Sequence, residues 1–457
     1  RTMTKMALSP LDIRWLALES KGTPMHLGSL AIFKKPAKAP SDFLQSLVQS
    51  LRSEKNVGLP WNLRLTKPFK LTRIPKMTSD KNIDLGYHFR HSALPTPGGE
   101  RELGILVSHL HSIELDKSRP LWECHIIEGL ENKRFAIYFK IHPCILRGGN
   151  AINTMMKMLS TSPRNRKMSP LWSLNPDFST NQNSREATQL LETAGSLGKN
   201  LASAGKAAKM LLSNAGKLKA PRSYLNKTNN NQRRFATQQY DESRILTIAD
   251  KADCSPNTII AFLCSSALRR FFKEYNALPD KPLIASVPLD LNDYVESNNK
   301  ETLATIRIPL ATNIADPIRR LQTIKDSAQS ISHHLQQLTD EAISSYAILS
   351  SLPVLADQVI GLGRLIPNLF NVGISNTEGS EAPLYLYGAK LEAIYPMAHL
   401  MQNSALSIDC ISYSGTINIG ITGARDTLPR LQRMALYMDQ ALTTLETQLS
   451  SAEESAA

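Results

Sequence analysis

The stretch of sequence that decides the fold runs from residue 138 to residue 149 and reads Tyr138-Phe139-Lys140-Ile141-His142-Pro143-Cys144-Ile145-Leu146-Arg147-Gly148-Gly149. Ahead of it, the aromatic and β-branched residues at positions 134–142 are typical of a buried strand. Behind it, positions 150–159 are predicted to form a helix. The single histidine and the paired glycines therefore lie at a strand-to-helix junction, where side chains can project from a rigid scaffold.

Length and composition predict a folded protein of two domains. A chain of 457 residues is too long for one ordinary hydrophobic core, so two domains of roughly 200 residues are expected. Its 42% hydrophobic and 20% charged residues are typical of a globular protein and argue against disorder. No apolar run approaches the ~20 residues that a spanning helix needs, which argues against an integral membrane protein.

Strand and helix patterns occur in both halves of the chain, without the regular alternation of a doubly wound sheet. Strands are expected at residues 24–33, 134–142, 282–289, 304–310, 370–376, 405–413 and 416–422. Helices are expected at residues 43–51, 150–159, 256–272, 316–335 and 428–449. This mixed pattern predicts an α/β sandwich in each half. We expect an N-terminal domain at 1–160, a linker at 161–231 and a C-terminal domain at 232–457.

Positive charge is concentrated in the linker and just after it. The net charge is +13, and the segment from Thr193 to Gln238 contains no Asp or Glu. Its nine basic residues are Lys199, Lys206, Lys209, Lys217, Lys219, Arg222, Lys227, Arg233 and Arg234. Between Leu197 and Lys219 the apolar residues fall near one face of a helix and the lysines lie away from that face. This pattern is typical of a helix on an anionic membrane or lipid-droplet surface. The alternative is a helix packed on its own protein with solvated lysines.

The cysteines and histidines predict no metal centre and no disulfide framework. The five cysteines are Cys124, Cys144, Cys254, Cys264 and Cys410. Their odd number and scattered spacing fit a reducing cytoplasm, and we expect a cytoplasmic protein that is peripheral at the inner membrane or at lipid inclusions. Cys144 could act as a nucleophile, although a small buried residue is the more frequent role. His109 and His111 have no acid cluster nearby, and no phosphate-binding loop or nucleophile elbow occurs.

Several segments, in the same order along nearly the whole chain, resemble the bacterial wax ester synthase/diacylglycerol acyltransferase family. They are Pro24-Met25-His26-Leu27-Gly28, residues 90–95 and 98–103, Pro120-Leu121-Trp122, Arg233-Arg234-Phe235-Ala236 and residues 384–392. The resemblance implies two chloramphenicol-acetyltransferase-like sandwich domains, joined by a helical linker, with a tunnel at their interface. It implies acyl-CoA as co-substrate on one side of the tunnel and a fatty alcohol or diacylglycerol on the other, with no permanently bound cofactor.

The junction matches the family signature His-His-x-x-x-Asp-Gly imperfectly. His142 matches the first His and Gly148 the Gly, whereas Pro143 and Arg147 occupy the positions of the second His and the Asp. In the family the second His is the general base on the acceptor hydroxyl, a task that suits an imidazole and that proline cannot perform. His142 is the only imidazole left in the motif and is the candidate catalytic residue. A structural role is its alternative, because consecutive side chains of an extended backbone point to opposite faces.

Other matched positions supply candidate substrate-binding residues. These are Pro120, Leu121, Trp122, Gly148, Asn257, Ser375 and Asn376. Trp122 would equally suit a hydrophobic core. Thr258 stands where the family has an Asp after Asn257, a further departure from the pattern.

The sequence therefore predicts an acyl-CoA-dependent O-acyltransferase that makes wax esters or triacylglycerol. Its activity is expected to be impaired, since loss of a general base alone costs ~10²–10⁴-fold. The alternative is a non-catalytic homologue that binds acyl-CoA, lipid or a sister enzyme through the same tunnel. Nucleic acid is not an expected partner, because the positive charge lies in a linker without interleaved aromatic residues.

Overall fold

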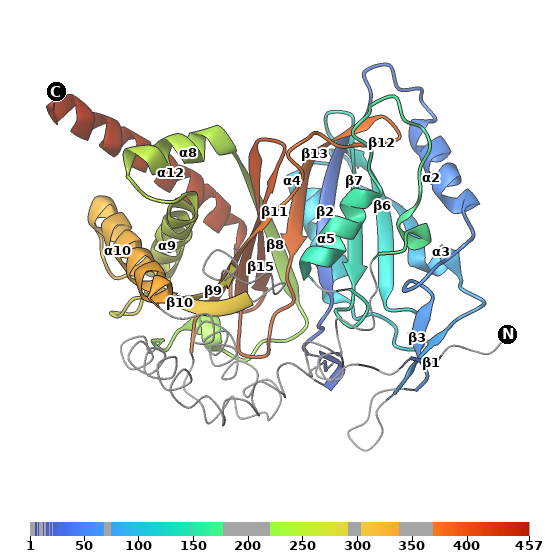
Figure 1. Cartoon of the computed structure of the whole chain (residues 1–457), viewed down its shortest axis with the longest axis horizontal. Helices are drawn as coiled ribbons and strands as arrows, with labels where there is room; N and C mark the ends of the chain where they lie inside the picture. The colour runs from blue at the N-terminus through green and yellow to red at the C-terminus, as the bar shows by residue number, and fades with distance from the viewer. Residues whose placement is uncertain are drawn as a thin grey trace.

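The computed structural model describes residues 22–67, 75–146, 148–176, 220–290, 303–337 and 369–456, together with positions 5, 6, 8, 12, 15–17, 19 and 20. Two six-stranded sheets stand side by side, each with helices on its outer face (Figure 1). A smaller sheet has the strand order β1-β4-β3, with β1 (Lys5–Met6), β3 (Leu63–Leu65) and β4 (Met77–Ser79). The two α/β sandwiches expected from the sequence are confirmed.

The first large sheet has the strand order β12-β13-β2-β7-β6-β5. Its strands are β2 (Leu27–Lys34), β5 (Phe89–Ala93), β6 (Trp122–Leu130), β7 (Arg134–Ile141), β12 (Tyr385–Leu386) and β13 (Ala389–Met397). The helices of this half are α2 (Phe43–Ser53), α3 (Leu85–His88), α4 (Glu100–Ser112) and α5 (Gly148–Lys157), followed by the short turns η1 (Leu171–Ser173) and η2 (Tyr224–Asn226). Strand β13 pairs antiparallel with β2, so residues from the second half of the chain complete the first sheet.

The second large sheet has the strand order β10-β9-β11-β14-β15-β8. Its strands are β8 (Arg233–Asp241), β9 (Ile284–Asp290), β10 (Leu303–Pro309), β11 (Val372–Glu378), β14 (Leu406–Tyr413) and β15 (Thr416–Ala424). Helices α8 (Glu242–Lys251), α9 (Pro256–Glu274), α10 (Pro317–Gln336) and α12 (Gln432–Ala456) lie on the side of this sheet that faces away from the first (Figure 1). Strand β11 runs parallel to β14, which places Ser375 beside Asp409.

Local signals in the sequence explain where the main elements begin. Helix α9 starts with Pro256, and the Oγ of Ser255 accepts a hydrogen bond from the N–H of Thr258. Helix α10 begins in the same way, with Asp316 as the N-cap and Pro317 as the first residue. The elements expected from the sequence form within the described residues, with shifted ends. The closing helix, for example, was expected at residues 428–449 and is α12 (Gln432–Ala456).

Helix α4 and strand β13 of the first sandwich pack against the second sheet. The Oγ of Ser108 accepts a hydrogen bond from the backbone N–H of Phe235 at 3.1 Å, and the Oγ of Ser112 accepts one from the N–H of Arg233 at 2.9 Å. A separate apolar cluster fills this contact, with Leu103 and Val107 of α4 packed among residues of both sheets. These interactions hold the two sheets together along one edge.

Two predictions from the sequence concern the middle of the chain. The helix expected from Leu197 to Lys219 lies outside the described residues, and the domain limits at 160 and 231 stay a prediction. Among the helices that the structure describes, none has the length and apolar character needed to cross a bilayer.

Candidate functional site at the junction of the two sheets

The junction between β7 and α5 is a turn closed by backbone hydrogen bonds. The N–H groups of Ile145 and Leu146 donate to the carbonyl oxygen of His142 at 2.9 and 3.4 Å. The N–H of His142 donates to the carbonyl oxygen of Leu121 at 3.0 Å. Because residues 142–146 are all buried, the turn is part of the core of the first sandwich.

The imidazole of His142 is fully buried and engaged inside this turn. Its Nδ1 accepts a hydrogen bond from the backbone N–H of Cys144 at 3.2 Å and lies 2.9 Å from the Sγ of the same residue. In a neutral imidazole an accepting Nδ1 leaves the proton on Nε2. That Nε2 lies 3.8 Å from the Oε2 of Glu19, and it has no hydrogen-bond partner among the described residues. His142 therefore has no lone pair available for a substrate proton.

Burial keeps His142 neutral. Burial lowers the pKa of His142 to about 4, the nearby Glu19 carboxylate opposes this effect, and Lys117 adds to it. The Nζ of Lys117 lies 3.0 Å from the Oε2 of Glu19, so the carboxylate already has a cationic partner. The arrangement supports the structural role for His142 rather than the catalytic one.

Position 143 supplies no base to the junction. Pro143 is buried and has no titratable group. Arg147 lies outside the described residues, and Gly148 is the first residue of α5. Burial raises the pKa of the Cys144 thiol well above its usual range, an effect to which Asp12 and Glu19 add, so Cys144 stays protonated and is a poor nucleophile.

The segment Pro120-Leu121-Trp122 is hydrogen-bonded to the turn. Leu121 provides the carbonyl that accepts the N–H of His142. Trp122 is fully buried, its indole Nε1 donates to the carbonyl oxygen of Trp61 at 2.8 Å, and its ring stacks on His88 with 4.6 Å between centroids. The geometry gives Trp122 a packing role in the core.

The three polar candidates of the second half lie at the start of α9 and on β11. The Nδ2 of Asn376 donates to the Oδ1 of Asn257 at 2.8 Å, which ties β11 to α9. Ser375 lies one position earlier on β11 and faces a cavity between the two sheets. The structure thus brings Asn257 and Asn376 together and places Ser375 apart from them.

A cavity of about 350 Å³ lies between the sheets, directly against the motif junction. From the first half it is lined by Leu27, Gly28, Ser29, Phe139, Ile141, Ala151 and Ile152. From the second half it is lined by Ser375, Thr377, Pro396, Met397, Ala398, His399, Ser407 and Asp409. Ile141 ends β7 and Ala151 belongs to α5, so the cavity touches the elements on both sides of the turn. The apolar residues come mainly from the first half, and most of the polar groups come from the second.

Asp409 is the one carboxylate in this lining. Its Oδ1 accepts a hydrogen bond from the Oγ of Ser375 at 2.5 Å, and its Oδ2 accepts one from the Oγ of Ser407 at 2.8 Å. Burial raises the pKa of the Asp409 carboxyl above its usual range, although both hydroxyl hydrogen bonds lower it. The two hydrogen bonds therefore fix the Asp409 carboxyl group on the polar side of the cavity.

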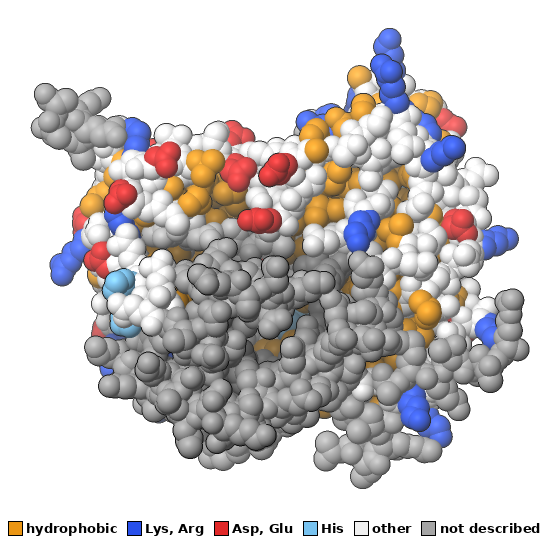
Figure 2. Space-filling model, viewed as in Figure 1, with side chains coloured by type: hydrophobic (Ala, Val, Ile, Leu, Met, Phe, Trp, Pro, Cys, Tyr) orange, Lys and Arg blue, Asp and Glu red, His pale blue; other side chains and the backbone are white. Residues whose placement is uncertain are grey.

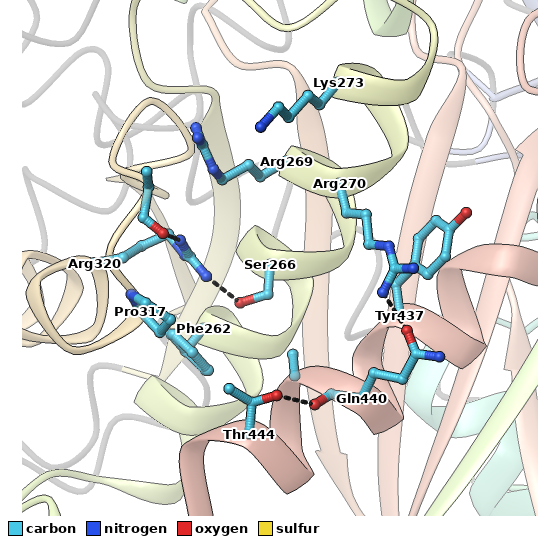
Figure 3. Close-up of a pocket in the computed structure, with 12 residues that line it drawn as sticks. Phe262, Ser266, Arg269, Arg270, Lys273, Pro317, Arg320, Tyr437, Gln440 and Thr444 are labelled. Carbon is cyan, nitrogen blue, oxygen red and sulfur yellow. Dashed lines mark hydrogen bonds between the residues drawn. The ribbon is translucent and has the colours of Figure 1, made fainter. Parts of the chain in front are cut away.

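A second cavity, of about 250 Å³, lies between α9, α10 and α12 (Figure 3). It is lined by four basic side chains, Arg269, Arg270, Lys273 and Arg320. Three of them are already engaged: Arg320 donates to Ser266, Arg269 to the carbonyl oxygen of Thr312, and Arg270 to Gln440. No described residue of the junction lines this cavity, so the cavity between the sheets is the better candidate for the functional site.

Within the described residues, no group of three His, Cys, Asp or Glu side chains is arranged to hold a metal ion. The five cysteines are free thiols, and four of them are buried.

Solved structures first define the class of fold. A condensation domain, the first of the calcium-dependent antibiotic synthetase, has a TM-score of 0.59 at 13% identity and covers 97% of this chain and 95% of its own, a likeness of fold alone. The wax ester synthase/diacylglycerol acyltransferase from Marinobacter aquaeolei VT8 has a TM-score of 0.80 at 34% identity, covering 97% of this chain and 100% of that chain.

Sequence comparisons then identify the family. The model of the wax ester synthase/diacylglycerol acyltransferase catalytic domain matches residues 8–260, and that of the family's C-terminal domain matches residues 301–446. The O-acyltransferase WSD of Acinetobacter baylyi is 33% identical over 462 residues, which cover 98% of this chain and 98% of the relative. A Mycobacterium tuberculosis protein provisionally named as a diacylglycerol O-acyltransferase is 35% identical over 97% of this chain and 98% of its own length. The chain belongs to the wax ester synthase/diacylglycerol acyltransferase family.

Sequence reasoning missed two of the polar residues that the cavity brings together, His399 and Asp409. Ser407 and Asp409 alternate with Ile408 and Cys410 on β14, a pattern that the sequence shows. That alternation would have placed the two polar residues on one face of the strand. It could not have shown that this face borders a cavity.

Proposed function

We propose that this protein is an acyl-CoA-dependent O-acyltransferase that joins a long acyl chain to the hydroxyl of a fatty alcohol or of diacylglycerol. The products are a wax ester or triacylglycerol, with free CoA. Family membership supports the reaction class. The observation that carries the proposal for this chain is the cavity between the sheets, beside the motif junction.

The lining of the cavity suits both reactants. Phe139, Ile141 and Ile152 offer an apolar wall for an acyl chain. Ser375, Thr377 and Asp409 offer polar groups for a thioester carbonyl and an acceptor hydroxyl. We propose that the acyl chain lies along the first wall and that the reacting atoms lie near the second. No permanently bound cofactor is part of the proposal, and acyl-CoA is the co-substrate.

A non-catalytic role is the second candidate, favoured by Pro143 in the motif and by the buried, engaged imidazole of His142. Such a homologue would bind acyl-CoA or lipid in the same cavity without turning it over.

One experiment separates the two functions. The purified full chain is incubated with palmitoyl-CoA and either hexadecanol or dipalmitoylglycerol, while released CoA thiol and the ester product are both quantified. Binding of a non-hydrolysable palmitoyl-CoA analogue is measured by calorimetry in parallel. Ester that accumulates in proportion to protein supports the acyltransferase. Binding without ester supports the non-catalytic homologue, and absence of both rejects the two candidates together.

We also propose that the protein is peripheral on anionic membranes or lipid inclusions through the basic stretch from Leu197 to Lys219. On the face shown in Figure 2, the described Lys and Arg side chains lie mostly apart around the edge of the molecule. The described part of this face therefore offers no continuous basic surface. The linker would supply this attraction, since seven basic residues and no carboxylate occur between positions 193 and 231.

A further inference from the structure

The family motif leaves this cavity without its usual base, because Pro143 replaces the imidazole and His142 is held inside the turn. One imidazole nevertheless lines the cavity among the described residues, that of His399, and one carboxylate, that of Asp409. Both come from the second half of the chain, His399 just after β13 and Asp409 on β14. We infer that His399 is the general base of this acyltransferase, with Asp409 as its anionic neighbour.

The backbone next to His399 is fixed from both halves of the protein. The Nε2 of His111, on α4, lies 2.9 Å from the carbonyl oxygen of Ala398. The Nδ1 of His111 lies 2.9 Å from the hydroxyl of Tyr138. Burial lowers the pKa of His111 to about 3, so this imidazole is neutral: it accepts from Tyr138 and donates to Ala398. The N–H of Ala398 in turn donates to the Oγ1 of Thr422 at 3.2 Å.

The ring of His399 is positioned as well. Its imidazole meets the indole of Trp15 edge to face, with 4.9 Å between centroids and an interplanar angle of 74°. Residue 399 is partly exposed and lines the cavity, unlike the fully buried His142. A base must be reachable by substrate and must not need to reorganise during the reaction. As a lining residue of the cavity His399 agrees with the first condition, and its contact with Trp15 agrees with the second.

Asp409 supplies the charge that such a base needs. Both of its oxygens accept hydroxyl hydrogen bonds, from Ser375 and Ser407, which fixes the carboxylate on the polar wall. A buried carboxylate with only neutral hydrogen-bond partners stabilises a cation formed in the same cavity. Burial raises the pKa of Asp409 because it disfavours the charged form, and a cation formed in the same cavity would favour that form again. An imidazolium formed at His399 during proton transfer would be that cation.

Acyl transfer from the thioester to the hydroxyl needs no reactant besides these two groups and the two substrates. The imidazole of His399 takes the proton of the acceptor hydroxyl while the hydroxyl oxygen forms a bond to the thioester carbonyl carbon. The tetrahedral intermediate collapses, the C–S bond breaks, and the sulfur leaves with the electron pair. The imidazolium returns its proton to this thiolate. The products are an ester and CoA, and His399 is neutral again.

The inference rests on the proposed acyltransferase function, and substitutions at His399 test it in the full chain. Ester synthesis from palmitoyl-CoA and hexadecanol is measured for the parent, His399→Ala and His399→Gln, with melting temperatures recorded for each. The matched control is His109→Ala, an exposed position on α4. We expect kcat to fall ~10²–10⁴-fold in both His399 variants, with little change in the KM for palmitoyl-CoA. Added imidazole should restore part of the turnover in His399→Ala and none in His399→Gln, where the side chain still fills the space.

The variant Asp409→Asn tests whether Asp409 acts together with His399. We expect a fall in kcat of ~10-fold or more, and the double variant with His399→Ala should be no slower than His399→Ala alone, because the two groups act as a unit. A folded His399→Gln variant that keeps the parent's turnover overturns the inference and leaves the acyltransferase function intact. An inactive parent with every acceptor rejects both. Full additivity of the Asp409 and His399 effects would reject the pairing of these residues.

Discussion

The Nδ1 of His142 accepts a hydrogen bond from the backbone N–H of Cys144 at 3.2 Å, within the turn that joins β7 to α5. The bond uses the lone pair that a general base would offer to its substrate. His142 therefore stabilises the turn and keeps its neutral form. The same contact explains why the remaining motif histidine cannot simply replace the imidazole missing at position 143.

Protonation of buried histidines should make the protein less stable in mild acid. Burial lowers the pKa of His142 to about 4 and that of His111 to about 3, from a usual value of 6.5. Between pH 6.5 and 4 the unfolded chain binds more protons at these sites than the folded chain, so the free energy of unfolding falls as the pH falls. The stability is fully present above this window. For His142 the full effect is at most about 3 kcal/mol.

The variant His142→Asn isolates this contribution. Its free energy of unfolding, measured with urea at several pH values from 7.5 to 4.5, should depend less steeply on pH than that of the parent. His109→Asn, at an exposed position, should keep the parent's slope. Equal slopes for His142→Asn and the parent would mean that His142 titrates normally in the folded protein.

Restoring the family motif should increase ester synthesis. We expect Pro143→His with Arg147→Asp to exceed the parent, and Pro143→His alone to do less. An imidazole without its Asp anchor would be poorly held, and a displacement near ~1 Å can cost ~10² in rate. The increase should be clearest in the His399→Ala background, where the remaining turnover is low. A double change that leaves this background inactive would indicate that other departures, such as Thr258, also matter.

Filling the cavity should abolish acyl-chain binding without unfolding the protein. Thr377 is partly exposed to the cavity, so Thr377→Trp would occupy space that the proposed acyl chain needs. Calorimetry with a non-hydrolysable palmitoyl-CoA should show a negative heat-capacity change for the parent and at least ~10-fold weaker binding for the variant. The control Thr447→Trp makes the same change at an exposed position of α12. Equal binding by both variants would place the ligand elsewhere.

Membrane attachment should depend on the lysines of the linker. Each Lys near an anionic surface is worth ~1 kcal/mol, and the attraction weakens with salt. We expect the protein to float with liposomes that contain anionic lipid, and the change of Lys199, Lys206, Lys209 and Lys217 to Glu should reduce the floating fraction. The same variant with neutral liposomes is the control. Flotation that the four changes leave unaltered would support a linker helix packed on its own protein.

Local patterns in the sequence were sufficient for the elements and for the family. The Ser-Pro and Asp-Pro pairs that begin α9 and α10 act within a single turn of chain, so they can be recognised without tertiary structure. The missing imidazole at Pro143 is also a property of the sequence alone. By contrast, nothing local indicated that β13 would pair with β2, since this pairing joins segments more than 300 positions apart.

The sequence by itself determined that the family's base is absent, and only the tertiary structure decided which polar residues line the cavity between the sheets. On β14, Ile408 and Cys410 pack in the core of the second sandwich, while Ser407 and Asp409 occupy the other face of the strand. A period of two assigns residues to a face but does not tell whether that face meets water or another sheet. The packing of α4 and β13 against the second sheet brings the face of Asp409 and the end of β13, with His399, to the same cavity. Such convergence depends on contacts between distant segments, and these form only in the folded protein.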